Sequence, residues 1–166
     1  HAALPRKAAR AGLYEPRWTN GVDMGSINDP AQLRSWHDRL SPSLAEFEQL
    51  AAHAYRNMPE EFLALTGDIM IRVADFPEDD VLDELGLETP YDLLGLFEGR
   101  GIADKWNPGT GEWPNRITLF RRPILDYWAE NEETLGDIVT HVLIHEIGHH
   151  FGMSDDDMER IETAAG

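Results

Sequence analysis

The sequence contains no cysteine among its 166 residues. A disulfide scaffold, a cysteine-ligated zinc site and a thiol nucleophile are therefore excluded, and any metal site must use histidine, aspartate or glutamate. No stretch approaches the roughly 18 consecutive apolar residues of a membrane span. The first ten residues also lack the apolar core of a secretory signal. These absences favour a cytoplasmic protein without a membrane partner.

Basic residues are scarce as well. Lysine and arginine total 14 against 31 acidic residues, which gives a formal net charge of −17. Residues 1–40 hold six of the basic residues and four acids, so the rest of the chain carries eight basic residues against 27 acids. Such an acidic body repels phosphate backbones. We therefore expect no nucleic-acid partner, and we expect a monomer.

Length and composition indicate one domain with an extension. Residues 1–40 show no clear period, apart from a short helix predicted to begin at Asp29-Pro30. Residues 41–166 form the predicted globular domain, because a capping-box pattern at Ser43–Glu46 opens its first helix. Apolar periodicity then predicts strands at 68–74, 91–97 and 117–121 and helices at 77–85, 123–130 and 132–151, the last capped by Asn131, with a long loop at 99–115. We expect an α+β fold, a small mixed sheet packed on helices.

The last long helix carries the motif His-Glu-x-x-His at residues 145–149. Residues i and i+4 lie one turn apart on the same helix face, so His145 and His149 can share one metal ion. Glu146 is offset by one position, where it can take a proton from metal-bound water without being a ligand. The pattern predicts a site for one zinc ion per chain, with Glu146 as the catalytic base.

A catalytic zinc site needs a third protein ligand. A glutamate on a further helix is one solution, but Glu159 and Glu162 follow the motif too closely for such a helix to be expected. In metzincins a glycine after the motif turns the chain back to the metal, and here Gly152 precedes Asp155 by three residues. Asp155 is therefore the expected third ligand. The neighbouring acids Asp156 and Asp157 remain alternatives.

The motif and its surroundings resemble the bacterial minimal zincin-like family of zinc metallopeptidases. The likeness covers roughly residues 43–163 and is carried by His145–Asp157 with two upstream segments, 93–99 and 116–121. It implies a compact metzincin-like fold in which His145, His149 and Asp155 bind zinc and Glu146 is the base. Only 11 residues follow Asp155, so Met158 is not expected to form the methionine turn of full metzincins.

The same analogy implies how a substrate would bind. Residues 117–121 would form the sheet edge that pairs with an extended peptide. The residues implied as substrate contacts are Ile117, Thr118, Leu119 and Trp113. The alternative is that these residues only pack the sheet. Candidates for stabilising an oxyanion are Tyr91, Tyr127, Arg121 and Arg122, and the sequence does not choose among them.

Other histidines have simpler interpretations. His141 lies one turn before His145 and is either a packed helix residue or an auxiliary to the metal site. His150 lies off the ligand face. Three functions are compatible with the whole pattern: a zinc-dependent hydrolase acting on peptides or unfolded proteins, a zinc- or peptide-binding module with little turnover, and an interaction domain with a chance motif. Retention of Glu146 favours the hydrolase, because a structural metal site needs no base.

Overall fold

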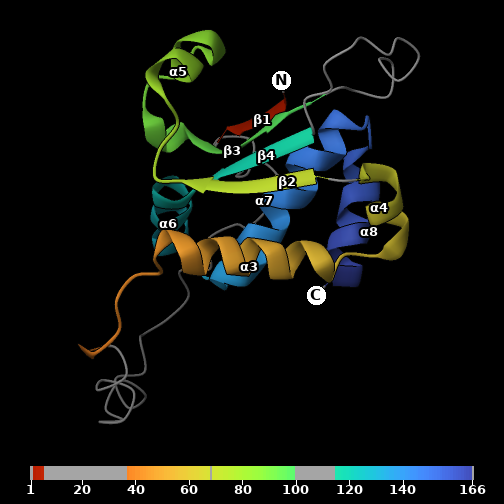
Figure 1. The fold of residues 1–166 in the computed structure, drawn as a ribbon, viewed down its shortest axis with the longest axis horizontal. Helices are drawn as coiled ribbons and strands as arrows, with labels where there is room; N and C mark the ends of the chain where they lie inside the picture. The colour runs from red at the N-terminus through yellow and green to blue at the C-terminus, as the bar shows by residue number, and fades with distance from the viewer. Residues whose placement is uncertain (1, 6–36, 68, 100–114, 166) are drawn as a thin grey trace, which may run out of the picture.

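The computed structural model describes residues 2–5, 37–67, 69–99 and 115–165. These residues form a small mixed sheet packed on helices, so the predicted α+β class is confirmed (Figure 1). The described part of the chain holds no helix that is long and apolar enough to cross a membrane. The elements are β1 (Ala2–Pro5), α3 (Leu44–Arg56), α4 (Glu60–Thr66), β2 (Ile69–Ala74), α5 (Asp79–Leu85), a 3-10 turn (Pro90–Asp92), β3 (Leu93–Glu98), β4 (Asn115–Phe120), α6 (Arg121–Glu130), α7 (Leu135–His150) and α8 (Asp155–Ala165).

The sheet has four strands in the order β1-β3-β4-β2. β3 pairs antiparallel with both β1 and β4, whereas β2 pairs parallel with β4. The predicted strand at 117–121 is therefore central, so the prediction that it forms a peptide-binding edge of the sheet is wrong. Its backbone is already paired on both sides, and Ile117 and Leu119 are fully buried in the core. Strand order depends on contacts between distant segments, which alternation along one strand does not reveal.

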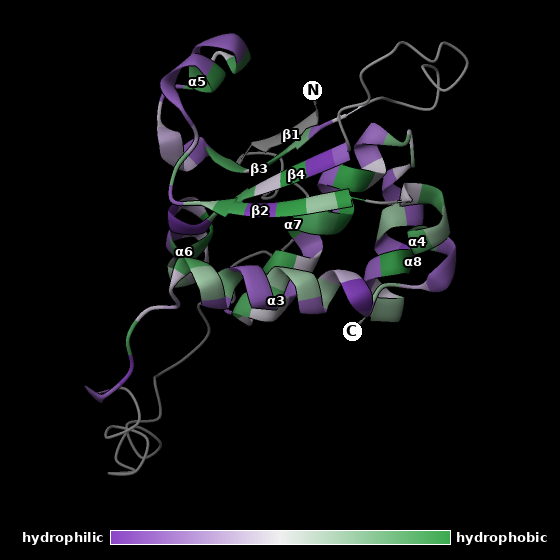
Figure 2. Ribbon diagram, in the orientation of Figure 1, coloured by the Kyte–Doolittle hydropathy of each residue, from purple (hydrophilic) through white to green (hydrophobic). Residues whose placement is uncertain are grey.

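α7 is the central helix of the fold and carries the motif. Its middle is apolar on nearly every side, and Figure 2 shows it as a largely hydrophobic ribbon behind the sheet. A helix that is hydrophobic all round is buried on all sides. α7 contacts α3, α6, α8 and the strands β1, β3 and β4. The buried residues that fill this core from α7 are Ile138, Val139, Val142, Leu143, Ile144 and Ile147.

Local hydrogen bonds decide where the helices begin. Ser43 and Glu46 form the predicted capping box of α3, with the Ser43 amide donating to Glu46 at 2.8 Å. The predicted cap of α7 at Asn131 is wrong, because Asn131 instead ends α6 and donates to the Tyr127 carbonyl. α7 begins after Thr134, whose hydroxyl accepts from the Asp137 amide at 3.1 Å. The threonine hydroxyl thereby satisfies an amide that the first turn of the helix leaves without an intrahelical partner.

Gly95 serves a close approach between a strand and a helix. A glycine inside a strand often marks a bulge. Gly95 stays in register with Leu119 of β4, whereas the pairing with β1 shifts register directly beside it, from Gly95 to Leu93. A Cβ atom at this position would lie 2.9 Å from Val142 and 3.1 Å from the Cγ atom of Glu146. Glycine therefore lets β3 approach α7 closely, and this contact places the Glu146 side chain directly beneath the strand.

The C-terminal segment forms a helix that the sequence pattern does not predict. α8 begins at Asp155 and follows α7 after Gly152, whose φ of 72° lies in the left-handed region that favours glycine. Met158 is fully buried and packs on Gly148, where a Cβ atom would meet its sulfur. Met158 thus supports the motif helix from a helix rather than from a turn. α7 and α8 contact one another, and this pairing brings Glu162 of α8 to His141 of α7.

Candidate metal centre

Three histidines stand one turn apart along α7. His141, His145 and His149 are spaced four residues apart, so they share a helix face. The ring centroids of His141 and His145 are 4.1 Å apart, and those of His145 and His149 are 5.6 Å apart. Exposure rises along the row: His141 is buried, His145 is half-buried and His149 is exposed. The helix therefore presents its imidazoles from the core out to the surface.

One donor cluster is already gathered at the inner end of this row. Among the described residues, His141, His145 and Glu162 form a group whose ligand atoms all lie within 4.8 Å of one another. Glu162 reaches it from α8, and its Oε1 atom lies 2.8 Å from Nδ1 of His141. We call these three residues the inner set. The sequence pattern alone does not identify Glu162 as a member, because it does not predict α8.

The motif itself defines a second donor cluster. His145, His149 and Asp155 form the outer set, which the sequence predicts as the zinc ligands. The structure does not gather all three within the same short distance, and His149 and Asp155 are exposed. Asp155 occupies the first turn of α8. Its charge nevertheless acts on His145, so both sets meet at that residue.

The environment of His145 suits a metal ligand. Partial burial, and after it the neighbouring His141, lowers the pKa of His145 to about 4. The carboxylates of Glu162 and Asp155 act in the opposite direction with smaller effect. An imidazole must be neutral to bind a metal ion, and a pKa of about 4 keeps His145 neutral at pH 7.

The predicted base Glu146 is almost completely buried, with 1% of its surface exposed. It lies on the side of α7 that faces β3, where its Cγ and Oε1 atoms approach Gly95. His150 also faces this strand and stacks on Phe97 with ring centroids 4.1 Å apart. Glu146 is thus held between the motif helix and the sheet, next to His145 in the chain.

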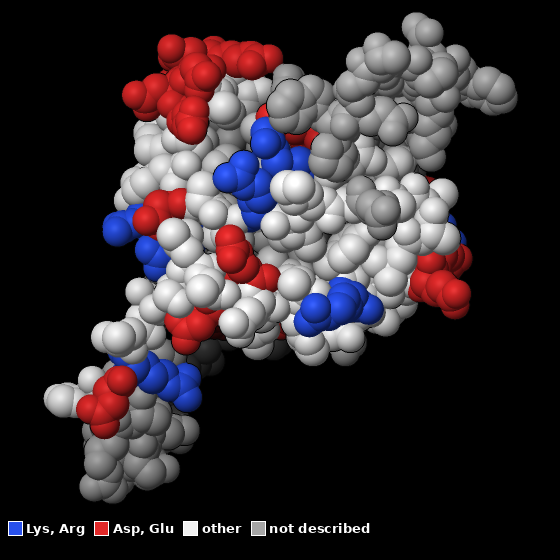
Figure 3. Space-filling view, in the orientation of Figure 1, with Lys and Arg blue, Asp and Glu red and all other residues white. Residues whose placement is uncertain are grey.

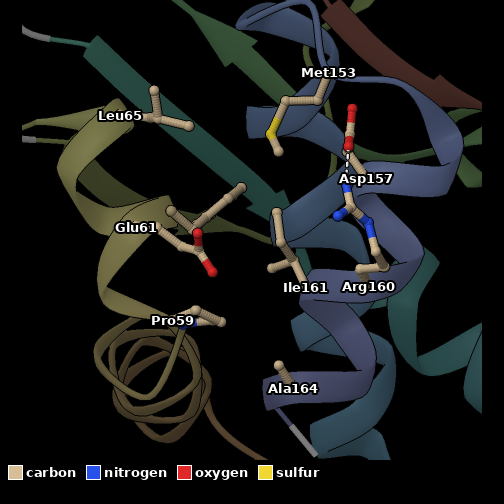
Figure 4. Close-up of a pocket in the computed structure, with 9 residues that line it drawn as sticks. Pro59, Glu61, Leu65, Met153, Asp157, Arg160, Ile161 and Ala164 are labelled. Carbon is tan, nitrogen blue, oxygen red and sulfur yellow. Dashed lines mark hydrogen bonds and ion pairs between the residues drawn. The ribbon is translucent and has the colours of Figure 1, made fainter.

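Asp157, one of the two alternative third ligands, is engaged in hydrogen bonds at the start of α8. The Ser154 hydroxyl lies 2.6 Å from the Asp157 carboxylate, and the Asp157 amide donates back to it. Hydrogen bonds from Ser154, and then from Arg160, hold the pKa of Asp157 below its ordinary value. Figure 4 shows Asp157 joined to Arg160 beside a groove between α4 and α8. Asp157 therefore caps α8, which speaks against it as an alternative third ligand.

The other predicted contacts do not gather at this centre. Tyr91, Arg121 and Arg122 line a shallow hollow with Ser41 and residues of α6, and no α7 residue is among the described residues that line it. Arg121 is bound there to Asp75 at 2.7 Å. Tyr127 is buried in the core. Thr118 belongs to the central strand, and Trp113 lies outside the described residues.

Zinc fits the chemistry of this cluster. Neutral imidazole and carboxylate are the donors that zinc accepts in the absence of cysteine. The Nε2 atom of His141 is buried without a hydrogen-bond partner among the described residues, and its Nδ1 atom is engaged with Glu162. A carboxylate on one ring nitrogen is the usual support for a histidine that acts at a metal through the other. These residues are compatible with a bound metal ion.

Comparisons with known proteins agree with this chemistry. The profile of a family described as zincin-like metallopeptidase matches residues 66–165, which include β2 to α8. The chain is also 29% identical over 140 residues to a protein named endoribonuclease YbeY from Allorhizobium ampelinum, a match that covers 81% of this chain and 77% of that protein. The family match covers more than half of the 166 residues and contains the motif helix. The chain belongs to the zincin-like metallopeptidase family.

Proposed function

We propose that this protein is a zinc-dependent hydrolase that cleaves peptide bonds, with His145, His149 and Asp155 as the zinc ligands and Glu146 as the base. The observation that carries the proposal is the placement of the motif: two imidazoles one turn apart on α7, with the Glu146 side chain held against β3 beside them. Zinc, when bound, supplies a Lewis acid that polarises the scissile carbonyl and lowers the pKa of water.

Exposure favours the outer set as ligands. A catalytic zinc site keeps one coordination position open to substrate. His149 and Asp155 are exposed, whereas His141 is only 8% exposed and is held by Glu162. The inner pair then positions His145 from the core side. The opposite assignment, with His141 and Glu162 as ligands, is favoured by their short separation, and zinc affinities of single variants distinguish the two.

Glu146 supplies the proton chemistry in this proposal. Its carboxylate accepts a proton from the attacking water and passes it to the leaving amine. Burial beneath β3 confines the side chain to one region, so the carboxylate is already positioned beside the motif histidines before a substrate binds. A binding module with little turnover needs no such group.

A second candidate is cleavage of RNA, because the relative is named as an endoribonuclease. That name speaks against the expectation that nucleic acid is no partner. Figure 3 shows a group of basic side chains over the sheet, while acidic side chains cover α5 and other parts of this face. The net charge of −17 opposes phosphate binding over most of the molecule. Peptide hydrolysis therefore remains the first candidate.

The test compares both substrates on zinc-loaded protein. We expect hydrolysis of an unfolded protein or a random peptide library, its loss on chelation, and a fall of at least about 100-fold in Glu146→Gln at unchanged zinc content. The matched control is Glu48→Gln, which changes an exposed glutamate of α3. Cleavage of single-stranded RNA without peptide cleavage would establish the second candidate. No cleavage of either, with zinc bound, would favour the binding module.

A further inference from the structure

An open groove runs between α4 and α8. Figure 4 shows the two helices facing one another across it, with side chains from both directed into the space between them. The lining residues of α4 include Glu61 and Leu65, four positions apart, and those of α8 stand at positions 157, 160, 161 and 164. Spacings of three and four residues place side chains on one face of a helix. Each helix therefore presents one stripe of side chains to the groove.

The floor and part of the rim of this groove are apolar. Phe62 and Ile161 form the floor, with 1% and 9% of their surfaces exposed. Leu65 extends the apolar surface outward and is 49% exposed, and Met153 and Ala164 border it. An apolar surface that continues from the core out to solvent and has a polar rim is a feature of interaction sites.

The size of the groove favours the side chains of a protein over a free small molecule. Its cavity volume is about 220 Å³, below the roughly 300–1,000 Å³ of pockets that enclose small ligands. α8 has 11 residues, so its length is about 16 Å, or about three helical turns. A third helix laid along such a groove inserts side chains that are three and four positions apart in its own sequence.

The charges at the groove indicate the chemistry of the partner. Glu61 points into the groove (Figure 4), and its carboxylate makes no hydrogen bond or ion pair with another described residue. The other two charged residues there, Asp157 and Arg160, pair with each other. One negative charge is thus left uncompensated, and a cationic side chain complements it. A second copy of this chain is a poor match, because its net charge is −17 as well.

We propose that the groove between α4 and α8 binds an amphipathic helix of another protein. The helix places apolar side chains, one turn apart, against Phe62, Leu65 and Ile161, and a lysine or arginine beside Glu61. Burial of the exposed part of Leu65 is the main gain on binding. The proposal is independent of the hydrolase, since none of the described residues that line the groove belongs to the inner or the outer set.

A model helix tests the proposal on the full chain. The probe is a fluorescent, alanine-based peptide of about 15 residues, long enough to form a helix in water. Its leucines stand at i, i+4 and i+7 with lysines beside them, and anisotropy measures its binding. We expect Leu65→Asp to lower the affinity at least about tenfold, because a carboxylate replaces an apolar contact. The matched control is Leu44→Asp, which changes an exposed leucine of α3. Equal affinities of the two variants would overturn the proposal.

Two further comparisons separate the apolar stripe from general attraction between charges. A peptide of the same composition, with its leucines spread around the helix, should bind at least about tenfold more weakly. Equal binding of the two peptides would mean that charge alone holds them, and the groove would lose its role. Glu61→Gln should weaken binding of the lysine peptide about threefold, while Glu48→Gln on α3 leaves it unchanged. The same effect in both variants would contradict the placement of the cation beside Glu61.

A second pair of variants covers the case in which Leu65→Asp does not fold. Ala164→Gln narrows the groove from the wall formed by α8, and Thr163→Gln changes the neighbouring exposed residue, which does not line it. We expect only Ala164→Gln to lower the affinity for the peptide, again about tenfold. Equal affinities would overturn the proposal. A dimer in sedimentation that Leu65→Asp dissociates and Leu44→Asp does not would also overturn it, and would assign the groove to a second copy of the chain.

Discussion

The two ends of the histidine row on α7 differ in what creates them. The outer set is encoded by a short motif, and its members His149 and Asp155 remain at the surface. The inner set is created by packing, because α8 brings Glu162 to within 2.8 Å of His141. A sequence motif therefore identifies candidate metal ligands on one helix, whereas the tertiary structure is needed to identify residues that contact them from other helices. His145 belongs to both sets, and variants of each set separate their roles.

The largest effect is expected at the shared residue. His145→Ala should reduce zinc from about one ion per chain to nearly none, because both sets lose a ligand. Elemental analysis of purified protein measures this directly. His53→Ala, which changes an exposed histidine on α3, serves as the control. Full zinc content in His145→Ala would show that the metal does not bind at the histidines of α7.

The next effect ranks the two sets. If the outer set binds zinc, His149→Ala and Asp155→Ala should weaken zinc affinity far more than His141→Ala. The inner variant should still lose about 10- to 100-fold, since it removes a group that positions a ligand. Competition with a chelator measures the affinities, and Asp156→Ala is the neighbouring control. A greater loss in His141→Ala and Glu162→Gln would move the metal to the inner set.

The smallest effect probes the packing that holds the inner set. Gly148→Ala places a methyl group against the Met158 sulfur and should destabilise the fold by about 1–3 kcal/mol. Thermal unfolding measures the change. Gly136→Ala is the control, because a methyl group there would lie 3.7 Å from the Thr134 hydroxyl oxygen, an ordinary contact distance. Equal stability of the two variants would show that α7 and α8 separate easily at this contact.

Local signals make part of this structure predictable. The capping box at Ser43 and the motif on α7 depend on residues within one helical turn of each other, and both are found as predicted. β1 and the central position of β4 depend on pairing between distant segments, so no single stretch of sequence contains them. α8 escapes prediction for a different reason: Gly152 in the metzincin pattern indicates a return of the chain to the metal, although here it leads into a second helix.

The α7–α8 pair has a consequence for the order of folding. His141 and Glu162 are 21 residues apart in the chain, whereas the parallel pairing of β2 with β4 joins Ile69 to Asn115, 46 positions later. Contacts between near neighbours form faster than distant ones, because less chain entropy is lost in closing the loop. The hypothesis follows that the histidines and acids assemble on a helical hairpin early in folding. On the same argument the contact of Glu146 with Gly95 of β3 forms later, because these two residues are 51 positions apart in the chain.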